Sequence, residues 1–132
     1  IEPVGTLKTR LAVVRDVRRG DNVGYGLRYQ APVDMRVGVL PIGYGDGYPR
    51  VRNEGFVLLN SRRAPIIGAN AMDSTMIDVT GISGATAWDE VVLMGRQGGD
   101  KITAHDLADW KGTVSYEVLT ALRSRVPRVY HQ

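Results

Sequence analysis

Hydrophobic and polar positions alternate over short stretches of this chain, and glycine, asparagine and aspartate separate one stretch from the next. Such alternation is typical of half-buried strands, and these separating residues are typical of tight turns. The pattern predicts strands over residues 6–17, 35–42, 55–59, 64–67, 75–79 and 90–94, with turns at 20–22, 60–62, 81–84 and 98–100. Many short strands joined in this way favour a barrel or a sandwich.

Helical signals occur only near the C-terminus. Thr103 followed by Asp106 resembles a capping box, and Leu107 and Trp110 then fall on one helical face. Apolar positions recur at helical spacing again from residue 115, until a proline at 127 ends any helix. We therefore expect one domain over residues 1–132, of the mainly β class: a small closed or partly open β-barrel with one or two short helices near the C-terminus.

Composition narrows the possible functions. Hydrophobic residues make up 43% of the chain and charged residues 23%, which suits a compact globular domain. The absence of cysteine excludes disulfides and thiolate metal ligands, and two histidines are too few for a histidine-based metal cluster. No apolar stretch is long enough for a membrane helix, so we expect no membrane contact and a cytoplasmic location. The chain begins at Ile1, and we expect it to be one part of a longer protein.

The net charge of +3 comes from basic residues that are interleaved with acidic ones, which is typical of a solvated surface. A small β-barrel that binds nucleic acid remains an alternative, given the strand pattern and the sequence pI of about 9.4. The aromatic residues do not form a strip interleaved with basic ones, as single-strand binding uses, so we expect no nucleic-acid partner.

The most unusual segment is 41–50, Pro-Ile-Gly-Tyr-Gly-Asp-Gly-Tyr-Pro-Arg. Its alternate glycines permit backbone conformations or close approaches that a Cβ atom would forbid. A phosphate-binding loop is conceivable, but the spacing fits neither the P-loop nor the dinucleotide fingerprint. Taken by itself, the segment favours a sharp structural turn.

Three further positions combine candidate chemistry with an ordinary structural alternative. Tyr25 is flanked by glycines that leave its phenol accessible, although composition alone favours an aromatic residue half buried on a strand. Met72 lies in a segment whose methionines would usually fill gaps in a core. Tyr116, near the start of a predicted helix, could lie beside an anion held by helix N-terminal amides, or pack in the core.

Taken in order, these segments resemble the C-terminal domain of the alanine racemase family. The matching stretches are 23–26, 41–50, 63–68, 72–79, 89–95, 114–118 and 125–130, so the resemblance covers nearly the whole chain. The resemblance implies a pyridoxal-phosphate-dependent isomerase that interconverts L-alanine and D-alanine and supplies D-alanine for bacterial peptidoglycan. It also implies an N-terminal barrel domain, whose lysine carries the cofactor, and a homodimer whose active sites are shared between subunits. Because no lysine of this chain lies in a similar motif, we expect the isolated domain to be inactive.

The resemblance also implies residue roles. Tyr25 matches the base that serves the L face of the substrate, and Tyr116 matches the tyrosine that hydrogen-bonds the cofactor phosphate. Tyr44 matches the residue that narrows the substrate entrance, and the backbone N–H of Met72 matches a donor to the substrate carboxylate. Two further positions match the entrance channel, namely Arg50 and Asp73.

Two positions depart from the family pattern. Many relatives have arginine where this chain has Ala69 and cysteine where it has Ala71, which puts the charge network of the entrance in doubt. A dimerisation domain that has lost catalysis is the remaining alternative. Retention of Tyr25, Tyr44, Met72 and Tyr116 together argues against it.

Overall fold

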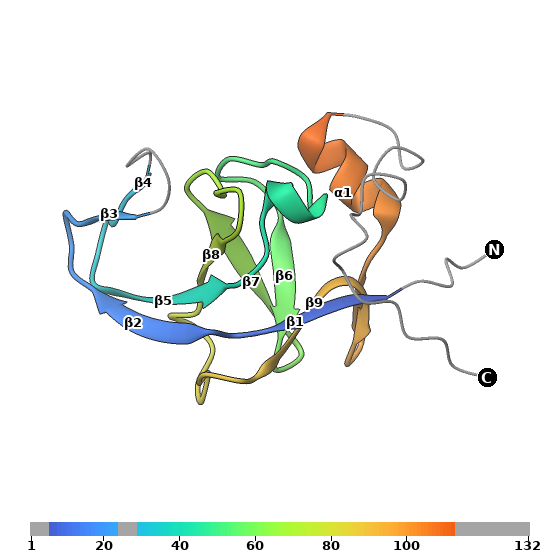
Figure 1. Cartoon of the computed structure of the whole chain (residues 1–132). Coiled ribbons are helices and arrows are strands. Elements are labelled where there is room, and N and C mark those ends of the chain that lie inside the picture. Colours follow the sequence, from blue (N-terminus) through green and yellow to red (C-terminus); the bar gives the residue numbers. More distant parts are fainter. Residues whose placement is uncertain (1–5, 24–28, 113–132) are drawn as a thin grey trace.

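A computed structural model describes residues 6–23 and 29–112, and this part of the chain forms a curled antiparallel sheet with a helix at one end (Figure 1). The fold is mainly β, as predicted. Its elements in chain order are β1 (Leu7–Arg10), β2 (Val13–Val17), β3 (Asn22–Val23), β4 (Tyr29–Gln30), β5 (Met35–Leu40), the 3-10 helix η1 (Tyr44–Asp46), β6 (Phe56–Leu59), β7 (Arg62–Ile67), β8 (Thr75–Asp78), β9 (Glu90–Gln97), β10 (Asp100–Ile102) and α1 (Ala104–Lys111).

The sheet curls into a partly open barrel because one chain segment occupies both of its ends. Its strand order is β1-β9-β6-β7-β8-β5-β2, with β10 paired to β9. Leu11 and Ala12 join the two end strands: the Leu11 N–H donates to the Asp89 carbonyl at 3.0 Å, whereas the Ala12 N–H donates to the Val39 carbonyl at 2.9 Å. The prediction of one strand over 6–17 is therefore wrong. The segment forms two strands, because the chain passes there from one edge of the sheet to the other.

Tight turns join the strands where the sequence predicted them. Asn60 and Ser61 connect the paired residues Leu59 and Arg62, and both have positive φ, at 50° and 61°. This two-residue loop has the φ signature of a type I′ turn, which suits the right-handed twist of a hairpin. A second hairpin, between β9 and β10, turns at residues 98–99, although the sequence did not predict β10 itself.

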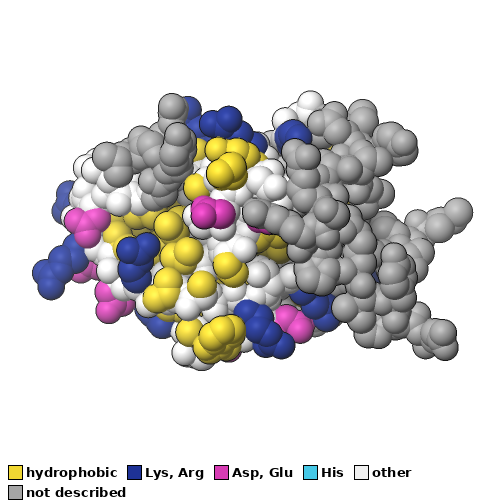
Figure 2. All heavy atoms as spheres, viewed as in Figure 1, with side chains coloured by type: hydrophobic (Ala, Val, Ile, Leu, Met, Phe, Trp, Pro, Cys, Tyr) yellow, Lys and Arg dark blue, Asp and Glu magenta, His cyan; other side chains and the backbone are white. Residues whose placement is uncertain are grey.

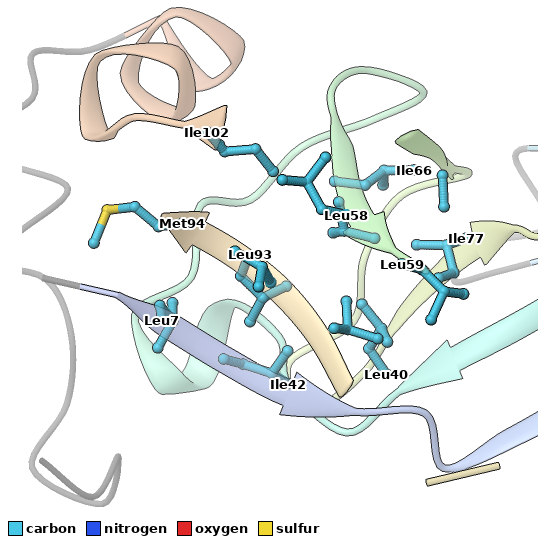
Figure 3. Close-up of a cluster of buried hydrophobic side chains, with 14 of the residues drawn as sticks. Leu7, Leu40, Ile42, Leu58, Leu59, Ile66, Ile77, Leu93, Met94 and Ile102 are labelled. Atoms are coloured by element: carbon cyan, nitrogen blue, oxygen red, sulfur yellow. The ribbon is translucent and has the colours of Figure 1, made fainter. Parts of the chain in front are cut away.

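The main core fills the interior of the curled sheet (Figure 3). Leu40, Leu58, Ile77 and Leu93 lie there, and all four are almost completely inaccessible to solvent. Gly38, on the same face of β5 as Leu40, leaves room for Leu11: a Cβ atom at position 38 would come within 2.8 Å of the Leu11 side chain. The glycine thus permits the close packing needed where the chain crosses between sheet edges.

A second, smaller apolar cluster lies on the other face of the sheet. The short strands β3 and β4 pair with each other, and Val23 and Ala31 pack there with Met35, Val37 and Ile67. The β3–β4 pair lies at the opposite end of the sheet from α1 (Figure 1). The segment that carries Tyr25, residues 24–28, connects these two strands and lies outside the described residues.

The helix α1 begins with the predicted capping box. The Thr103 hydroxyl accepts the Asp106 N–H at 3.0 Å, and the Asp106 carboxylate accepts the Thr103 N–H at 2.8 Å. The Trp110 ring packs against Phe56 of β6, with 5.1 Å between ring centroids, and so joins the helix to the sheet. The second predicted helix, from residue 115, lies outside the described residues.

Within the described ranges, 6–23 and 29–112, no helix has the length and apolar character needed to cross a membrane.

Candidate functional site

Two loops that the sequence singled out lie against each other. We call residues 41–51 the tyrosine loop and residues 69–74 the methionine loop. The Tyr44 N–H donates to the Ala71 carbonyl at 3.2 Å, and the Gly45 N–H donates to the Met72 carbonyl at 2.7 Å. These backbone bonds bring Tyr44 and Met72, which were both predicted as site residues, onto adjacent parts of the surface.

The close approach of the loops requires glycine at position 43. A Cβ atom there would overlap the Ala71 carbonyl oxygen and lie 2.8 Å from the Asp73 nitrogen. The tyrosine loop then turns through η1, which ends at Gly47 with a φ of 91°, a conformation that glycine adopts readily. The alternating glycines of this segment therefore form the sharp turn that the sequence predicted, and one of them lets two loops meet.

Met72 is exposed and does not fill a gap in the core. Its relative exposure is 60%. Its backbone N–H has no acceptor among residues 6–23 and 29–112. The preceding residue, Ala71, is held in place by backbone hydrogen bonds to Ser74 and Tyr44. A backbone N–H without a protein acceptor in an exposed residue can donate to an anionic ligand. Asp73, the next residue, is also exposed.

Tyr44 and Arg50 form a contact within the tyrosine loop. The Arg50 guanidinium carbon lies 5.0 Å from the centroid of the Tyr44 ring, within the range of a cation–π interaction. Tyr44 is half-buried and Arg50 is exposed, so the pair lies at the surface. The structure thus groups four predicted residues at one place, namely Tyr44, Arg50, Met72 and Asp73.

Buried polar side chains hold the backbone of the tyrosine loop by hydrogen bonds. None of them was predicted from the sequence. The Thr75 hydroxyl donates to the Ile42 carbonyl at 2.7 Å, and the Asp46 carboxylate accepts the Gly43 N–H at 3.0 Å. Asn70 bonds the far end of the tyrosine loop. Asn70 lies in the methionine loop and Thr75 begins β8, and both bond backbone atoms far away in the chain, so no local sequence signal marked them.

Tyr25 and Tyr116 lie outside the described residues, so the structure does not place them. An open hollow of about 360 Å³ lies between β3 and the outer face of β2, β5 and β8. Its walls include Val23, which directly precedes the segment carrying Tyr25, and Arg15, Val37 and Met76.

The lysines of this chain do not fit covalent attachment of a cofactor. Lys8 is exposed and pairs with Glu90 at 3.4 Å, and Lys101 and Lys111 are also exposed on the surface. A lysine that carries an aldehyde cofactor is instead held in a desolvated pocket that lowers its pKa. Within the described ranges there is also no group of three or more side chains suited to holding a metal ion.

An apolar row crosses the outer face of the sheet. Val13, Val39 and Met76 are register partners on β2, β5 and β8, and Val13 is 41% exposed. Figure 2 shows hydrophobic side chains gathered over these strands, with charged side chains around them.

Among the aromatic side chains of residues 6–23 and 29–112, only that of Trp88 is largely exposed. Stacking with single-stranded nucleic acid uses several aromatic side chains, so the surface does not favour that alternative.

Comparison with known proteins gives consistent matches. Residues 4–130 match the family described as "Alanine racemase, C-terminal domain". Alanine racemase from Halothermothrix orenii is 44% identical over 131 residues, a match that covers 98% of this chain and 35% of that protein. Alanine racemase from Geobacter sulfurreducens is 42% identical over 132 residues, also covering 35% of its own length. The chain thus spans about a third of the length of these relatives.

Solved structures agree with this comparison. The crystal structure of alanine racemase from a D-cycloserine-producing Streptomyces lavendulae has a TM-score of 0.93 and 35% sequence identity, and the match covers all of this chain and 35% of that one. Alanine racemase from Bacillus anthracis, solved with bound L-Ala-P, has a TM-score of 0.90 and 34% identity over 96% of this chain and 32% of that one.

Proposed function

The chain belongs to the alanine racemase family, as its C-terminal domain, and on that premise we propose that it completes the active site of an enzyme that interconverts L-alanine and D-alanine. The whole domain, residues 1–132, would pack against an N-terminal barrel domain, and the enzyme would act as a homodimer. In a bacterium, such an enzyme supplies D-alanine for peptidoglycan.

The observation that best supports this proposal is the junction of the tyrosine and methionine loops. It places the half-buried Tyr44 and the exposed Met72 side by side, with an unbonded Met72 N–H among the described residues. A free backbone amide suits a carboxylate, and a neighbouring aromatic ring limits the space for the rest of the ligand. This arrangement fits a small amino acid better than a long polymer.

Proton transfer on two faces of the α-carbon is the chemistry that the enzyme requires. Pyridoxal phosphate, when bound, stabilises the negative charge that proton loss leaves on the α-carbon. The Tyr25 phenol would take the proton from L-alanine and return it in the reverse direction, while a lysine of the barrel domain serves the D face. A tyrosine phenol has an ordinary pKa of about 10, so Tyr25 needs cationic or hydrogen-bonding neighbours to act as a base at neutral pH.

The other proposed site residues would bind the substrate and the cofactor and limit the size of the substrate. The Met72 N–H would donate to the substrate carboxylate, the Tyr44 ring would narrow the entrance, and the Tyr116 hydroxyl would donate to the cofactor phosphate. Tyr25, Tyr44 and Met72 would reach the site of the other subunit, whereas Tyr116 would serve its own. Since no described lysine of this chain fits the cofactor, the isolated domain should not racemise alanine.

The experiment that tests this function is Tyr25→Phe in the full-length protein. The substitution keeps the ring and removes only the acid-base group, so we expect racemisation to fall by roughly 10²–10⁴. In heavy water the variant should still exchange the α-proton of D-alanine, because the opposite face keeps its base. Exchange from L-alanine should be largely abolished, as measured by proton NMR.

The control is Tyr29→Phe, in the strand that follows the same segment. The Tyr29 hydroxyl donates a hydrogen bond to the Met35 sulfur at 3.8 Å, and this variant should keep near-normal rates for both enantiomers. If Tyr25→Phe also exchanged both enantiomers at near-normal rates, Tyr25 would not be the L-face base.

A further inference from the structure

The buried polar side chains of the described residues gather at one place. Among residues 6–23 and 29–112, three polar or charged side chains are buried, namely Asp46, Asn70 and Thr75. Each one bonds the backbone of the tyrosine loop. A polar group is costly to bury unless it is hydrogen-bonded, so such groups commonly specify a geometry that apolar packing alone would not fix.

Asn70 makes the most extensive of these contacts. Its side-chain oxygen accepts the Val51 N–H at 3.0 Å, and its side-chain nitrogen donates to the Pro49 carbonyl at 2.9 Å. Its own backbone N–H donates to the Val51 carbonyl at 3.3 Å. Only 2% of the residue is exposed. One side chain therefore holds the backbone on both sides of Arg50.

These contacts extend in two directions towards the candidate site. On one side, fixing the backbone of Arg50 sets the point from which its guanidinium group reaches the Tyr44 ring. On the other side, Asn70 leads directly into Ala71 and Met72, whose carbonyls accept the N–H groups of the tyrosine loop. Asn70 thus links the entrance pair to the loop that carries the exposed amide.

We propose that Asn70 is a positioning residue that sets the selectivity of the substrate entrance. It fixes Arg50 against Tyr44 and keeps Met72 in register with Tyr44. The inference rests on the proposed function, because it takes Tyr44 and Met72 as residues that face the substrate. The role requires a short side chain that both donates and accepts a hydrogen bond, and an amide does so without ionising.

The test is Asn70→Ala in the full-length protein, with kcat and KM measured separately for L-alanine and L-serine. Small displacements of binding groups weaken productive binding strongly, so KM for alanine should rise roughly tenfold, with a smaller change in kcat. The preference for alanine over serine, as the ratio of kcat/KM values, should fall several-fold, since a loosened entrance admits the larger substrate.

The matched control is Leu59→Ala, which removes a fully buried side chain at the β6–β7 hairpin. It destabilises the domain but removes none of the hydrogen bonds that hold the two loops, so well below its unfolding temperature KM and selectivity should match the wild type. Native KM and selectivity in Asn70→Ala, or equal changes in Leu59→Ala, would overturn the proposal. If Asn70→Ala does not fold, Asn70→Ser takes its place under the same criteria.

A second readout separates this inference from the proposed function. Hydrogen exchange of the Val51 amide should accelerate in the Asn70 variant by more than its loss of global stability explains, whereas any acceleration in Leu59→Ala should match its loss of global stability. A wild-type protein without racemase activity would contradict the proposed function alone. Exchange at Val51 in the Asn70 variant that is unchanged, or that changes only as far as its loss of global stability explains, would contradict the positioning role itself.

Discussion

Tyr44 and Tyr48 lie in one loop, and their surroundings give them opposite properties. Tyr44 is half-buried at the surface beside Arg50, whereas Tyr48 is 2% exposed and its hydroxyl has no hydrogen-bond partner in the described part of the chain. Burial raises the pKa of the Tyr48 phenol above its ordinary value. Tyr48 therefore contributes its ring to the core, whereas its buried hydroxyl without a hydrogen-bond partner lowers the stability of the fold.

Tyr48→Phe should consequently leave the protein as stable as before or more stable, by up to about 1–3 kcal/mol, because it removes an unsatisfied buried group. The raised pKa also predicts a pH effect. Above about pH 10 the phenol ionises more readily in the unfolded state than in the folded state, so wild-type stability falls as the pH rises. The phenylalanine variant should lack this part of the fall. Urea denaturation at pH 7 and pH 10.5 measures both effects, and a clear loss of stability at pH 7 would mean that the hydroxyl has a partner.

Single residues were predictable where a motif marked them. The sequence singled out Tyr44 and Met72, and the structure places them together. It did not single out Asn70 or Thr75, because their hydrogen-bond partners are backbone atoms far away in the chain, Val51 and Ile42 among them. A side chain that bonds a distant backbone leaves no local pattern.

At the scale of elements, features that depend on residues close together in the sequence were predicted correctly. Features that depend on pairing between distant strands were not. The capping box at Thr103 was predicted because both of its bonds join residues three positions apart. The break between β1 and β2 was not predicted, because Leu11 and Ala12 change hydrogen-bond partners there and no turn-forming residue marks the change. From the sequence, a hydrophobic pattern that continues while the chain passes from one edge of the sheet to the other predicts a single strand.

Thr103→Ala tests the contribution of the cap to the helix. Losing the hydroxyl leaves the Asp106 N–H without its acceptor, and N-cap substitutions of this kind cost about 0.5–2 kcal/mol of unfolding free energy. Thr103→Ser keeps the acceptor and should stay close to the wild type. Denaturant titration compares the three proteins, and equal losses in both variants would show that the threonine methyl group, and not the cap, is responsible.

At the scale of the whole molecule, the described residues carry only part of the site that we propose. The two loops present Tyr44, Met72, Asp73 and Arg50 on one surface, while the described lysines are exposed and unsuited to the cofactor. An apolar row on the outer face of β2, β5 and β8 is also partly exposed. A surface of this kind suits burial against another domain or subunit.

Complementation between two inactive variants tests this central claim most directly. One full-length variant carries Tyr25→Phe, and the other carries alanine in place of the cofactor lysine of the barrel domain. If each site combines the lysine of one subunit with Tyr25 of the other, a mixed dimer contains one intact site. Co-expressed with random pairing, the two variants should regain about one quarter of the wild-type racemase rate. Activity no higher than that of the separate variants would contradict the account, because it would mean that this domain does not complete the partner's site.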